Sequence, residues 1–248
     1  MRYSDVLQLN RGDVVSIVGS GGKTSLLWRL ARENRARGVL VSTTTRMRWS
    51  EVAAFDWDIN CRGAHCAPAM HENAKGRGRT MCAPTGVSVF HGGMVDGKII
   101  APTMERLAVV CAGASLTLLE CDGSKGLPIK GWAAHEPVVP TFATVTIGVL
   151  PLWAIGMPVS KETVHRVERF CAITGAVLGD VVRVEHLASV VNHPDGLFAK
   201  TRGRRVLFLN DRGGMVHHVG ANCVRPLIPA DVLVVCGDIH RGTIEVIQ

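Results

Sequence analysis

DVVSIVGSGGKTSLLWRLA, residues 13–31, is the stretch of sequence that decides the fold. Residues 14–18 are mostly apolar and predict a buried strand that ends at Gly19. From Thr24 onward, apolar residues recur at helical spacing and predict a helix that ends near Gly38. The apolar run at 39–42 predicts a second strand. The stretch therefore opens a βαβ unit in which a glycine-rich turn joins the first strand to its helix.

The glycine-rich turn has the properties of a phosphate-binding loop. The first N–H groups of a helix have no partner within the helix, and the helix dipole favours an anion there. Glycines let the backbone wrap closely around phosphates, Lys23 can reach the terminal phosphates, and Thr24 can offer its hydroxyl to Mg²⁺. The alternative is a glycine turn followed by a surface lysine. We expect nucleotide contacts along the whole turn, from Gly19, Ser20, Gly21, Gly22, Lys23, Thr24 and Ser25.

The spacing of this turn distinguishes between nucleotide-binding motifs. The standard phosphate-binding pattern GxxxxGK[ST] fails, because Ile17 stands where its first glycine belongs. The turn has the shorter form GxxGKT, which resembles the loop of Mur-type ATP-dependent ligases. A dinucleotide fingerprint would need a third glycine at Thr24 and an acidic residue at the end of the second strand, where threonines stand. NAD binding is therefore not expected.

Two acidic residues follow an apolar run at residues 116–119, which predicts another buried strand. Glu120 and Asp122 stand at its carboxyl end, where P-loop proteins place the carboxylate that holds Mg²⁺ or its water. We expect both to act in catalysis together with Lys23. Asp122 is favoured as the metal ligand beside Thr24, because the glycine after it opens a turn. Its alternative role is to cap a loop at the end of a strand.

Other polar side chains near these strand ends are candidates for phosphate contacts. Thr43, Thr44 and Thr45 end the second strand and would face the ligand crevice of a doubly wound sheet, where hydroxyls can touch Mg²⁺ or the γ-phosphate. Their alternative role is that of β-branched strand residues and a helix cap. Lys125 and Lys130 follow the acidic residues and can neutralise phosphate charge. The alternative for both is a solvated loop lysine.

The rest of the chain continues the alternation of strands and helices. Helices are predicted over 104–112, 161–174 and 185–191, and strands over 144–149, 205–210 and 231–236. This order predicts an α/β fold with a doubly wound, mostly parallel sheet like that of P-loop NTPases, in one domain over residues 1–248. Within it, residues 56–101 are expected to form an insert or hairpin. Residues 56–85 lack periodicity, whereas 87–90 and 98–101 flank a glycine turn.

Composition narrows the class of ligand. The chain has 28 Lys and Arg against 21 Asp and Glu, a formal net charge of +7 that fits an anionic ligand such as a nucleotide. The basic residues are not interleaved with aromatic ones, so nucleic-acid binding is not expected. No apolar signal region begins the chain and no apolar run reaches membrane-spanning length, so we expect a cytoplasmic protein with free thiols and no membrane partner.

A group of cysteines and histidines falls in the expected insert. Its spacing is C-x₃-H-C-x₄-H and lacks the paired knuckles of structural zinc sites, so incidental thiols in a loop are expected. A metal site is the alternative. The residues concerned are Cys61, His65, Cys66, His71 and Cys82.

Several stretches together resemble one family, the YqeC-like accessory proteins of selenium-dependent molybdenum hydroxylases. They are VGSGGKTSLLWRLA (18–31), VSTTTRM (41–47), ECDGSKGLPIK (120–130), HEPVVP (135–140) and VHRVERF (164–170), and the resemblance weakens beyond His193. It implies a P-loop protein that assists maturation of such a hydroxylase, with its apoprotein or cofactor-maturation proteins as partners. His135 and Glu136 match the family's HEP motif, and His165 and Arg166 match its HR motif.

One element departs from the family pattern, and as a result the sequence does not identify the nucleotide base. The family carries an Asn-Lys-x-Asp-like element after a late strand, similar to the guanine-reading element of GTPases. Here the sequence is Asn210-Asp211-Arg212-Gly213, so the lysine is missing and the aspartate is displaced. Asn210 remains a candidate nucleotide contact, and the sequence does not choose between ATP and GTP.

We therefore expect an Mg²⁺-dependent nucleotide-binding protein that acts as an NTPase. His135 and Glu136 are further candidates, because a histidine beside a carboxylate can serve in acid–base chemistry or hold a metal-bearing cofactor. A loop histidine bonded to backbone is the alternative. Two other functions stay open: a Mur-like ATP-dependent ligase or kinase acting on a small substrate, and a carrier or scaffold for a molybdenum cofactor that binds a nucleotide without cleaving it.

Overall fold

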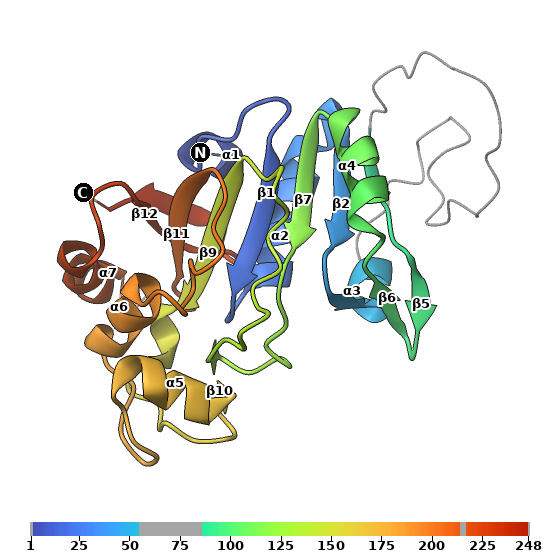
Figure 1. Cartoon of the computed structure of the whole chain (residues 1–248). Coiled ribbons are helices and arrows are strands. Elements are labelled where there is room, and N and C mark those ends of the chain that lie inside the picture. Colours follow the sequence, from blue (N-terminus) through green and yellow to red (C-terminus); the bar gives the residue numbers. More distant parts are fainter. Residues whose placement is uncertain (1, 55–85, 214–216, 248) are drawn as a thin grey trace, which may run out of the picture.

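A large, mostly parallel sheet forms the centre of the molecule (Figure 1). The computed structural model describes residues 2–54, 86–213 and 217–247, apart from the side chains of residues 217–220. Within these residues the sheet order is β13-β12-β11-β9-β1-β7-β2-β4, and β13 alone runs antiparallel to its neighbour. Its strands are β1 (Val14–Gly19), β2 (Val39–Thr43), β4 (Val87–Val89), β7 (Leu116–Glu120), β9 (Val145–Pro151), β11 (Arg204–Asn210), β12 (Leu233–Asp238) and β13 (Thr243–Val246).

The strand order explains where a ligand can bind. From β1 the chain crosses to β2 and β4, returns to form β7 between β1 and β2, and then moves to β9 on the other side of β1. The direction of winding therefore reverses at β1, and the predicted doubly wound α/β fold is confirmed. Such a reversal leaves a crevice outside the carboxyl ends of the strands, which is where β1, β7 and β2 deliver the candidate site residues.

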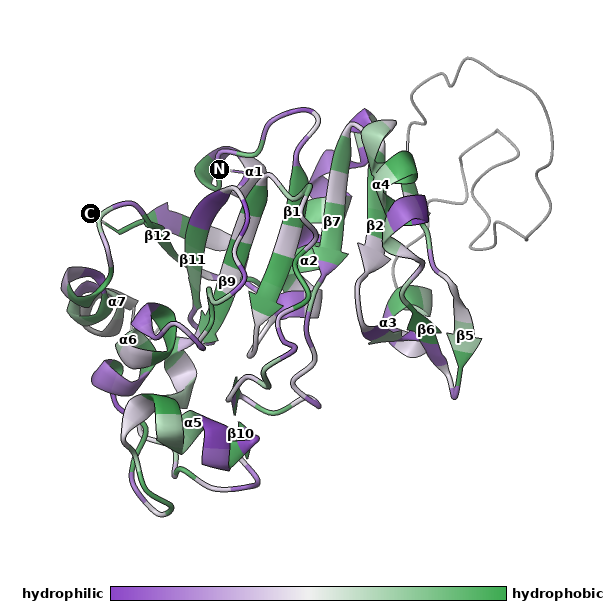
Figure 2. Cartoon of the chain, in the orientation of Figure 1, coloured by the Kyte–Doolittle hydropathy of each residue, from purple (hydrophilic) through white to green (hydrophobic). Residues whose placement is uncertain are grey.

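Helices cover both faces of the sheet. They are α1 (Tyr3–Val6), α2 (Lys23–Asn34), α3 (Trp49–Ala53), α4 (Met104–Ala112), α5 (Val167–Thr174), α6 (Val184–Asn192) and α7 (His217–Val224), with short 3₁₀ turns at Arg35–Arg37, Leu152–Ala154 and Arg225–Leu227. All of β1 is buried, and its side chains alternate between two apolar clusters. Val15 and Ile17 pack with α1 and α2, whereas Val14 and Val18 pack in the cluster that includes α4, α5 and α6. Figure 2 shows the resulting apolar strands between the helices.

Two smaller sheets lie beside the main one. The first is antiparallel and has the order β3-β6-β5, from β3 (Arg46–Arg48), β5 (Gly93–Val95) and β6 (Lys98–Ile100). The second pairs β8 (Ile129–Lys130) with β10 (Val164–His165). The hairpin expected between residues 87–90 and 98–101 differs in its first strand, because residues 87–89 join the edge of the main sheet beside β2.

Other expectations differ in their boundaries or fall outside the described residues. The helix expected over 161–174 begins at Val167, because residues 164–165 pair with β8. The helix expected over 104–112 is confirmed, and Thr103 caps it by accepting a hydrogen bond from the Arg106 N–H. The irregular segment expected over residues 56–85 and its cysteine–histidine group lie within residues 55–85, outside the described residues. In the described part of the chain, no helix has the length and apolar character to cross a membrane.

Candidate functional site

The turn after β1 takes a conformation that requires its glycines. Gly19 and Gly22 have φ angles of 102° and 142°, in the region that other residues rarely adopt. A Cβ atom on Gly19 would lie 2.2 Å from the carbonyl oxygen of Val149, and one on Gly22 would lie 2.6 Å from the Asn210 side-chain nitrogen. The turn therefore packs tightly against β9 and β11, which fixes the start of α2.

Backbone donors gather where this turn enters α2. The N–H of Ser20 donates to Val149, and the N–H of Leu26 donates to Gly22. Between them, the N–H groups of Gly21 to Ser25 donate to no acceptor among the described residues. Each of these residues lines one large cleft. A row of free N–H groups at the start of a helix forms a site for an anion.

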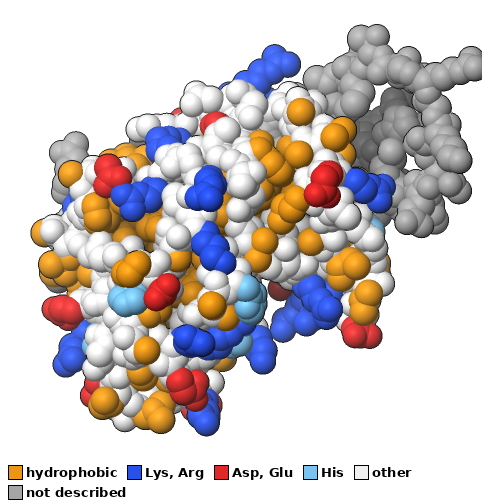
Figure 3. All heavy atoms as spheres, viewed as in Figure 1, with side chains coloured by type: hydrophobic (Ala, Val, Ile, Leu, Met, Phe, Trp, Pro, Cys, Tyr) orange, Lys and Arg blue, Asp and Glu red, His pale blue; other side chains and the backbone are white. Residues whose placement is uncertain are grey.

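The cleft lies at the carboxyl ends of the central strands. Its volume is about 900 Å³, near the upper end of the roughly 300–1,000 Å³ that small-molecule sites occupy. Figure 3 shows Lys, Arg and His side chains around the hollow that separates the β3-β6-β5 sheet from the lobe with α5 and β10. Of the predicted site residues, those that line the cleft are Gly21, Gly22, Lys23, Thr24, Ser25, Thr45, Glu120, Lys125, His135, Glu136 and Asn210.

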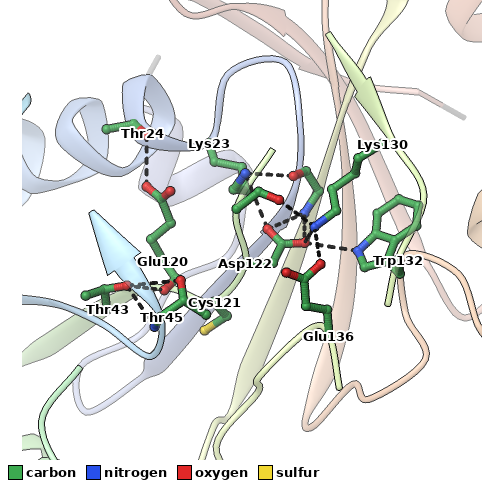
Figure 4. A network of polar contacts seen from close by, with 12 residues as sticks. Lys23, Thr24, Thr43, Thr45, Glu120, Cys121, Asp122, Lys130, Trp132 and Glu136 are labelled. Atoms are coloured by element: carbon green, nitrogen blue, oxygen red, sulfur yellow. Dashed lines mark hydrogen bonds and ion pairs between the residues drawn. The ribbon is translucent and has the colours of Figure 1, made fainter. Parts of the chain in front are cut away.

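Asp122 lies behind the cleft, fully buried, among several donors (Figure 4). Its two carboxylate oxygens accept from the Gly19 N–H at 3.1 and 3.0 Å, and one of them also accepts from the Trp132 indole N–H at 3.0 Å. The ammonium groups of Lys23 and Lys130 lie 3.3 and 3.2 Å from the same carboxylate. Asp122 therefore ties the glycine turn to the segment that follows β7.

Glu136 of the HEP motif and Arg166 of the HR motif meet in the hydrogen-bond network around Asp122. Lys130 is fully buried and also bonds Glu136 at 2.8 Å and the Gly123 carbonyl at 2.7 Å. Arg166 donates to both oxygens of Glu136, at 2.5 and 3.1 Å. Burial raises the pKa of Glu136, but the bond from Arg166 and the charge of Lys130 outweigh it, so that this pKa is lowered. Glu136 is thus held as an anion between two cations.

Glu120 takes a different position, although it stands only two residues before Asp122. Its side chain lines the cleft and accepts a hydrogen bond from the Thr24 hydroxyl at 2.8 Å. Burial raises the pKa of Glu120, and Lys23 and Thr24 offset this only in part. Burial acts to lower the pKa of Lys23, but Asp122 and Glu120 outweigh it and the pKa is raised. Lys23 is therefore a cation at neutral pH.

Hydroxyl and carboxylate oxygens suit Mg²⁺, which is typically bound by one or two such groups together with substrate phosphates and waters. Thr24 and Glu120 supply that donor set at the entrance to the row of free N–H groups. Among the described residues, no three His, Cys, Asp or Glu side chains are grouped as a metal cage would require. The residues fit a magnesium ion that is held jointly with a ligand.

The three threonines at the end of β2 have different surroundings. The Thr43 hydroxyl donates to the Glu120 carbonyl at 2.9 Å, and the Thr44 hydroxyl donates to the Val138 carbonyl at 2.7 Å. Both side chains therefore fix neighbouring segments, whereas Thr45 lines the cleft. Ser20 is buried, and its hydroxyl has no partner among the described residues.

The remaining predicted residues surround the cleft. Lys125 and His135 are exposed and line it, on the segment between β7 and β9. The Asn210 side chain donates to the Gly21 carbonyl at 2.7 Å, so it supports the glycine turn. His165 lies beside Arg166, and burial followed by the charges of Arg166 and Lys130 lowers its pKa to about 4.

Several residues of the site were missed in the sequence. Trp132 donates to Asp122, yet its position in a Pro-rich connection gave no indication of this. Trp153 and Arg212 lie together at one end of the cleft, with the guanidinium carbon 5.7 Å from the ring centre. Arg48 and Lys98 also line the cleft, from β3 and β6. Their pairing depends on the β3-β6 register, which spans residues far apart in sequence.

Comparisons with known proteins agree on one family. A family model described as YqeC protein matches residues 15–168. A protein of Escherichia coli (strain K12), named Uncharacterized protein YqeC, is 34% identical over 207 residues, which cover 81% of this chain and 76% of that protein. No solved structure matches. The matched range includes the glycine turn, both carboxylates at the end of β7 and the Glu136–Arg166 pair.

Proposed function

The chain belongs to the YqeC family, and from the geometry of its cleft we propose that it binds a nucleoside triphosphate with Mg²⁺ and hydrolyses it. The observation that carries this proposal is the row of free N–H groups from Gly21 to Ser25, which lines the cleft at the start of α2. Donors in that arrangement surround a phosphate and add the favourable end of the helix dipole. Lys23, at the same place, supplies a fixed positive charge.

The carboxylates of Glu120 and Asp122, at the end of β7, have separate tasks in this proposal. Thr24 and Glu120 hold Mg²⁺, which supplies positive charge to the β- and γ-phosphates when bound. Asp122 keeps Lys23 and the N–H of Gly19 in place. Because its oxygens already accept from several donors inside the protein, Asp122 positions the loop and does not contact the ligand.

The cellular role rests on the family resemblance. We propose that nucleotide hydrolysis serves the maturation of a selenium-dependent molybdenum hydroxylase in the cytoplasm. An interaction assay between this chain and the apoprotein of such a hydroxylase, with and without ATP and Mg²⁺, tests this role. Nucleotide-dependent association supports it, and the same association in the Lys23→Ala variant contradicts it.

Equilibrium binding and phosphate release with ATP and GTP test the biochemical proposal. We expect one nucleotide to bind in the presence of Mg²⁺ and to release phosphate. Lys23→Ala should weaken binding by roughly tenfold or more, since an ion pair with phosphate is lost. Lys161→Ala, at an exposed lysine outside the cleft, is the matched control.

Three results separate the alternatives. Binding without phosphate release would favour a nucleotide-dependent carrier or scaffold. ADP formation that requires a second substrate would favour a ligase or kinase. If neither ATP nor GTP binds, the proposed function is wrong.

A further inference from the structure

Three cations stand together where β3 and β6 line the cleft. Arg46 and Arg48 are two residues apart on β3, so their side chains leave the same face of that strand. Arg48 pairs directly with Lys98 of β6 across the antiparallel register. Met47, between the arginines, is buried on the opposite face. All three cations line the cleft, and all three are exposed.

In the part of the chain that the structure describes, these cations have no carboxylate partner. Glu51 of α3 lines the same cleft but is paired with none of them. Like charges placed directly opposite each other on two strands destabilise the sheet, as Arg48 and Lys98 do here. A bound anion would remove that repulsion.

The glycine turn has its own donors for an anion, and these belong to a different segment from the three cations of β3 and β6. In the proposed function, the free N–H groups at the start of α2, together with Lys23 and Thr24, bind the phosphates of the nucleotide in the same cleft. The cleft has a volume near the upper limit for small-molecule sites, about 900 Å³. Guanidinium groups match phosphate oxygens by paired hydrogen bonds, which favours phosphate over a weakly charged group.

We propose that Arg46, Arg48 and Lys98 bind the phosphate group of a second, phosphorylated small molecule, which lies in the same cleft as the nucleotide. This inference rests on the proposed nucleotide site and deepens it, because it gives the acceptor or effector of that site a chemical class. The second ligand is small, since it shares one cleft of about 900 Å³ with the nucleotide, and its phosphate faces the β3-β6 strands.

A titration with glycerol 2-phosphate, followed by phosphorus NMR, tests the proposal. The protein is titrated both free and after saturation with Mg²⁺ and a non-hydrolysable ATP analogue, so that the nucleotide site is already filled. The test variant is Arg48→Glu/Lys98→Glu. The control is Arg11→Glu/Arg37→Glu, which makes the same charge change at exposed arginines that lie outside the cleft.

We expect glycerol 2-phosphate to bind the nucleotide-loaded wild type and the control alike. The test variant should bind it at least roughly tenfold more weakly, because two attractive charges become repulsive, while its affinity for the ATP analogue changes less than twofold. Arg48→Lys should retain part of the affinity, since lysine keeps the charge but loses the paired geometry.

The two proposals can fail separately. If glycerol 2-phosphate does not bind the wild type, or binds test and control variants equally, the second site is wrong even where the ATP analogue binds. If the ATP analogue does not bind but glycerol 2-phosphate binds with the expected dependence on Arg48 and Lys98, the nucleotide proposal fails and the phosphate site stands.

Discussion

Glu120 and Asp122 are separated by one residue at the end of β7, and both are buried, yet they have different partners. Asp122 is fully buried and its carboxylate is bonded by the Gly19 N–H, Trp132 and Lys130. Glu120 faces the cleft, and the Thr24 hydroxyl is its side-chain partner. Because a strand alternates its side chains, this spacing alone would have placed both carboxylates on one face. The difference arises where β7 ends and the backbone leaves the sheet.

An acidic residue at the end of a strand is often expected both to stabilise the following loop and to bind the metal. Here two residues divide these roles. The Asp122 carboxylate stabilises the loop, and the Glu120 carboxylate in the cleft remains available to a ligand. Substitutions at the two positions should therefore affect different measurements. Those at Asp122 should change the free energy of unfolding, whereas those at Glu120 should change the dependence of nucleotide binding on Mg²⁺.

The largest effect is expected from Asp122→Ala. It leaves the ammonium groups of Lys23 and Lys130 buried without this carboxylate, and loss of one partner from a buried ion pair costs about 3–5 kcal/mol. Urea unfolding followed by circular dichroism measures the loss. Asp122→Asn keeps an acceptor for Trp132 and should lose less. An unfolding free energy within about 0.5 kcal/mol of wild type would contradict a structural role for Asp122.

A smaller effect on the same network is expected from Trp132→Phe. The substitution keeps most of the ring but removes the indole donor to Asp122, and a hydrogen bond to a charged group contributes about 1.5–3 kcal/mol. The same unfolding experiment measures it. Trp153→Phe is the control, because the Trp153 N–H has no partner among the described residues. Equal losses in both variants would mean that ring packing dominates.

Glu120→Gln should leave stability unchanged or slightly raised, and weaken binding. Its pKa is raised in the folded state, so the charged form is disfavoured and stability falls as pH rises through that pKa. Glutamine does not ionise, so the variant does not lose this stability as pH rises. Without the carboxylate, ATP affinity in Mg²⁺ should fall roughly tenfold or more, while affinity in EDTA should not change. Calorimetry in both buffers measures this, and equal weakening in both would contradict a metal role.

The smallest effect is a loss of folding stability at acidic pH. The pKa of His165 is lowered from 6.5 to about 4, so the unfolded chain binds more protons between these values, and stability falls as pH falls through that window. The loss should be on the order of 1 kcal/mol, because the ring is partly exposed and solvent screens it. Glu136, with its lowered pKa, stabilises the fold above about pH 4.5 and loses this effect only as pH falls below it.

Unfolding of His165→Gln at several pH values measures the histidine effect. The variant should show a flatter dependence of stability on pH between about 6.5 and 4 than the wild type, because glutamine does not titrate in that window. An unchanged slope would mean that another group, such as His186 with its lowered pKa, controls this range.

The sequence predicted the fold because its signals are local. The apolar run of β1, the glycine turn and the start of α2 follow one another in the chain, and their order decides the doubly wound sheet. The sequence also located the acidic end of β7. It favoured Asp122 over Glu120 as the metal ligand, because the donors that surround Asp122 come from residues 130–132 and leave no local signal.

The cations of β3 and β6 that line the cleft were missed for a similar reason. Arg46 and Arg48 look like ordinary charged residues after a strand, and Lys98 follows them only after fifty further residues. The β3-β6 register brings them together. Likewise, Thr43 and Thr44 point to carbonyls of other segments, which their sequence position beside the crevice did not reveal.

A crystal structure with Mn²⁺ and a non-hydrolysable ATP analogue, phased on the manganese signal, tests the central claim most directly. We predict that the metal binds the Thr24 hydroxyl, and the Glu120 carboxylate directly or through one water, with the terminal phosphates on the N–H groups of Gly21 to Ser25. Asp122 should remain bonded to Trp132. A metal bound by Asp122, or phosphates bound away from the glycine turn, would contradict the division of roles between the two carboxylates.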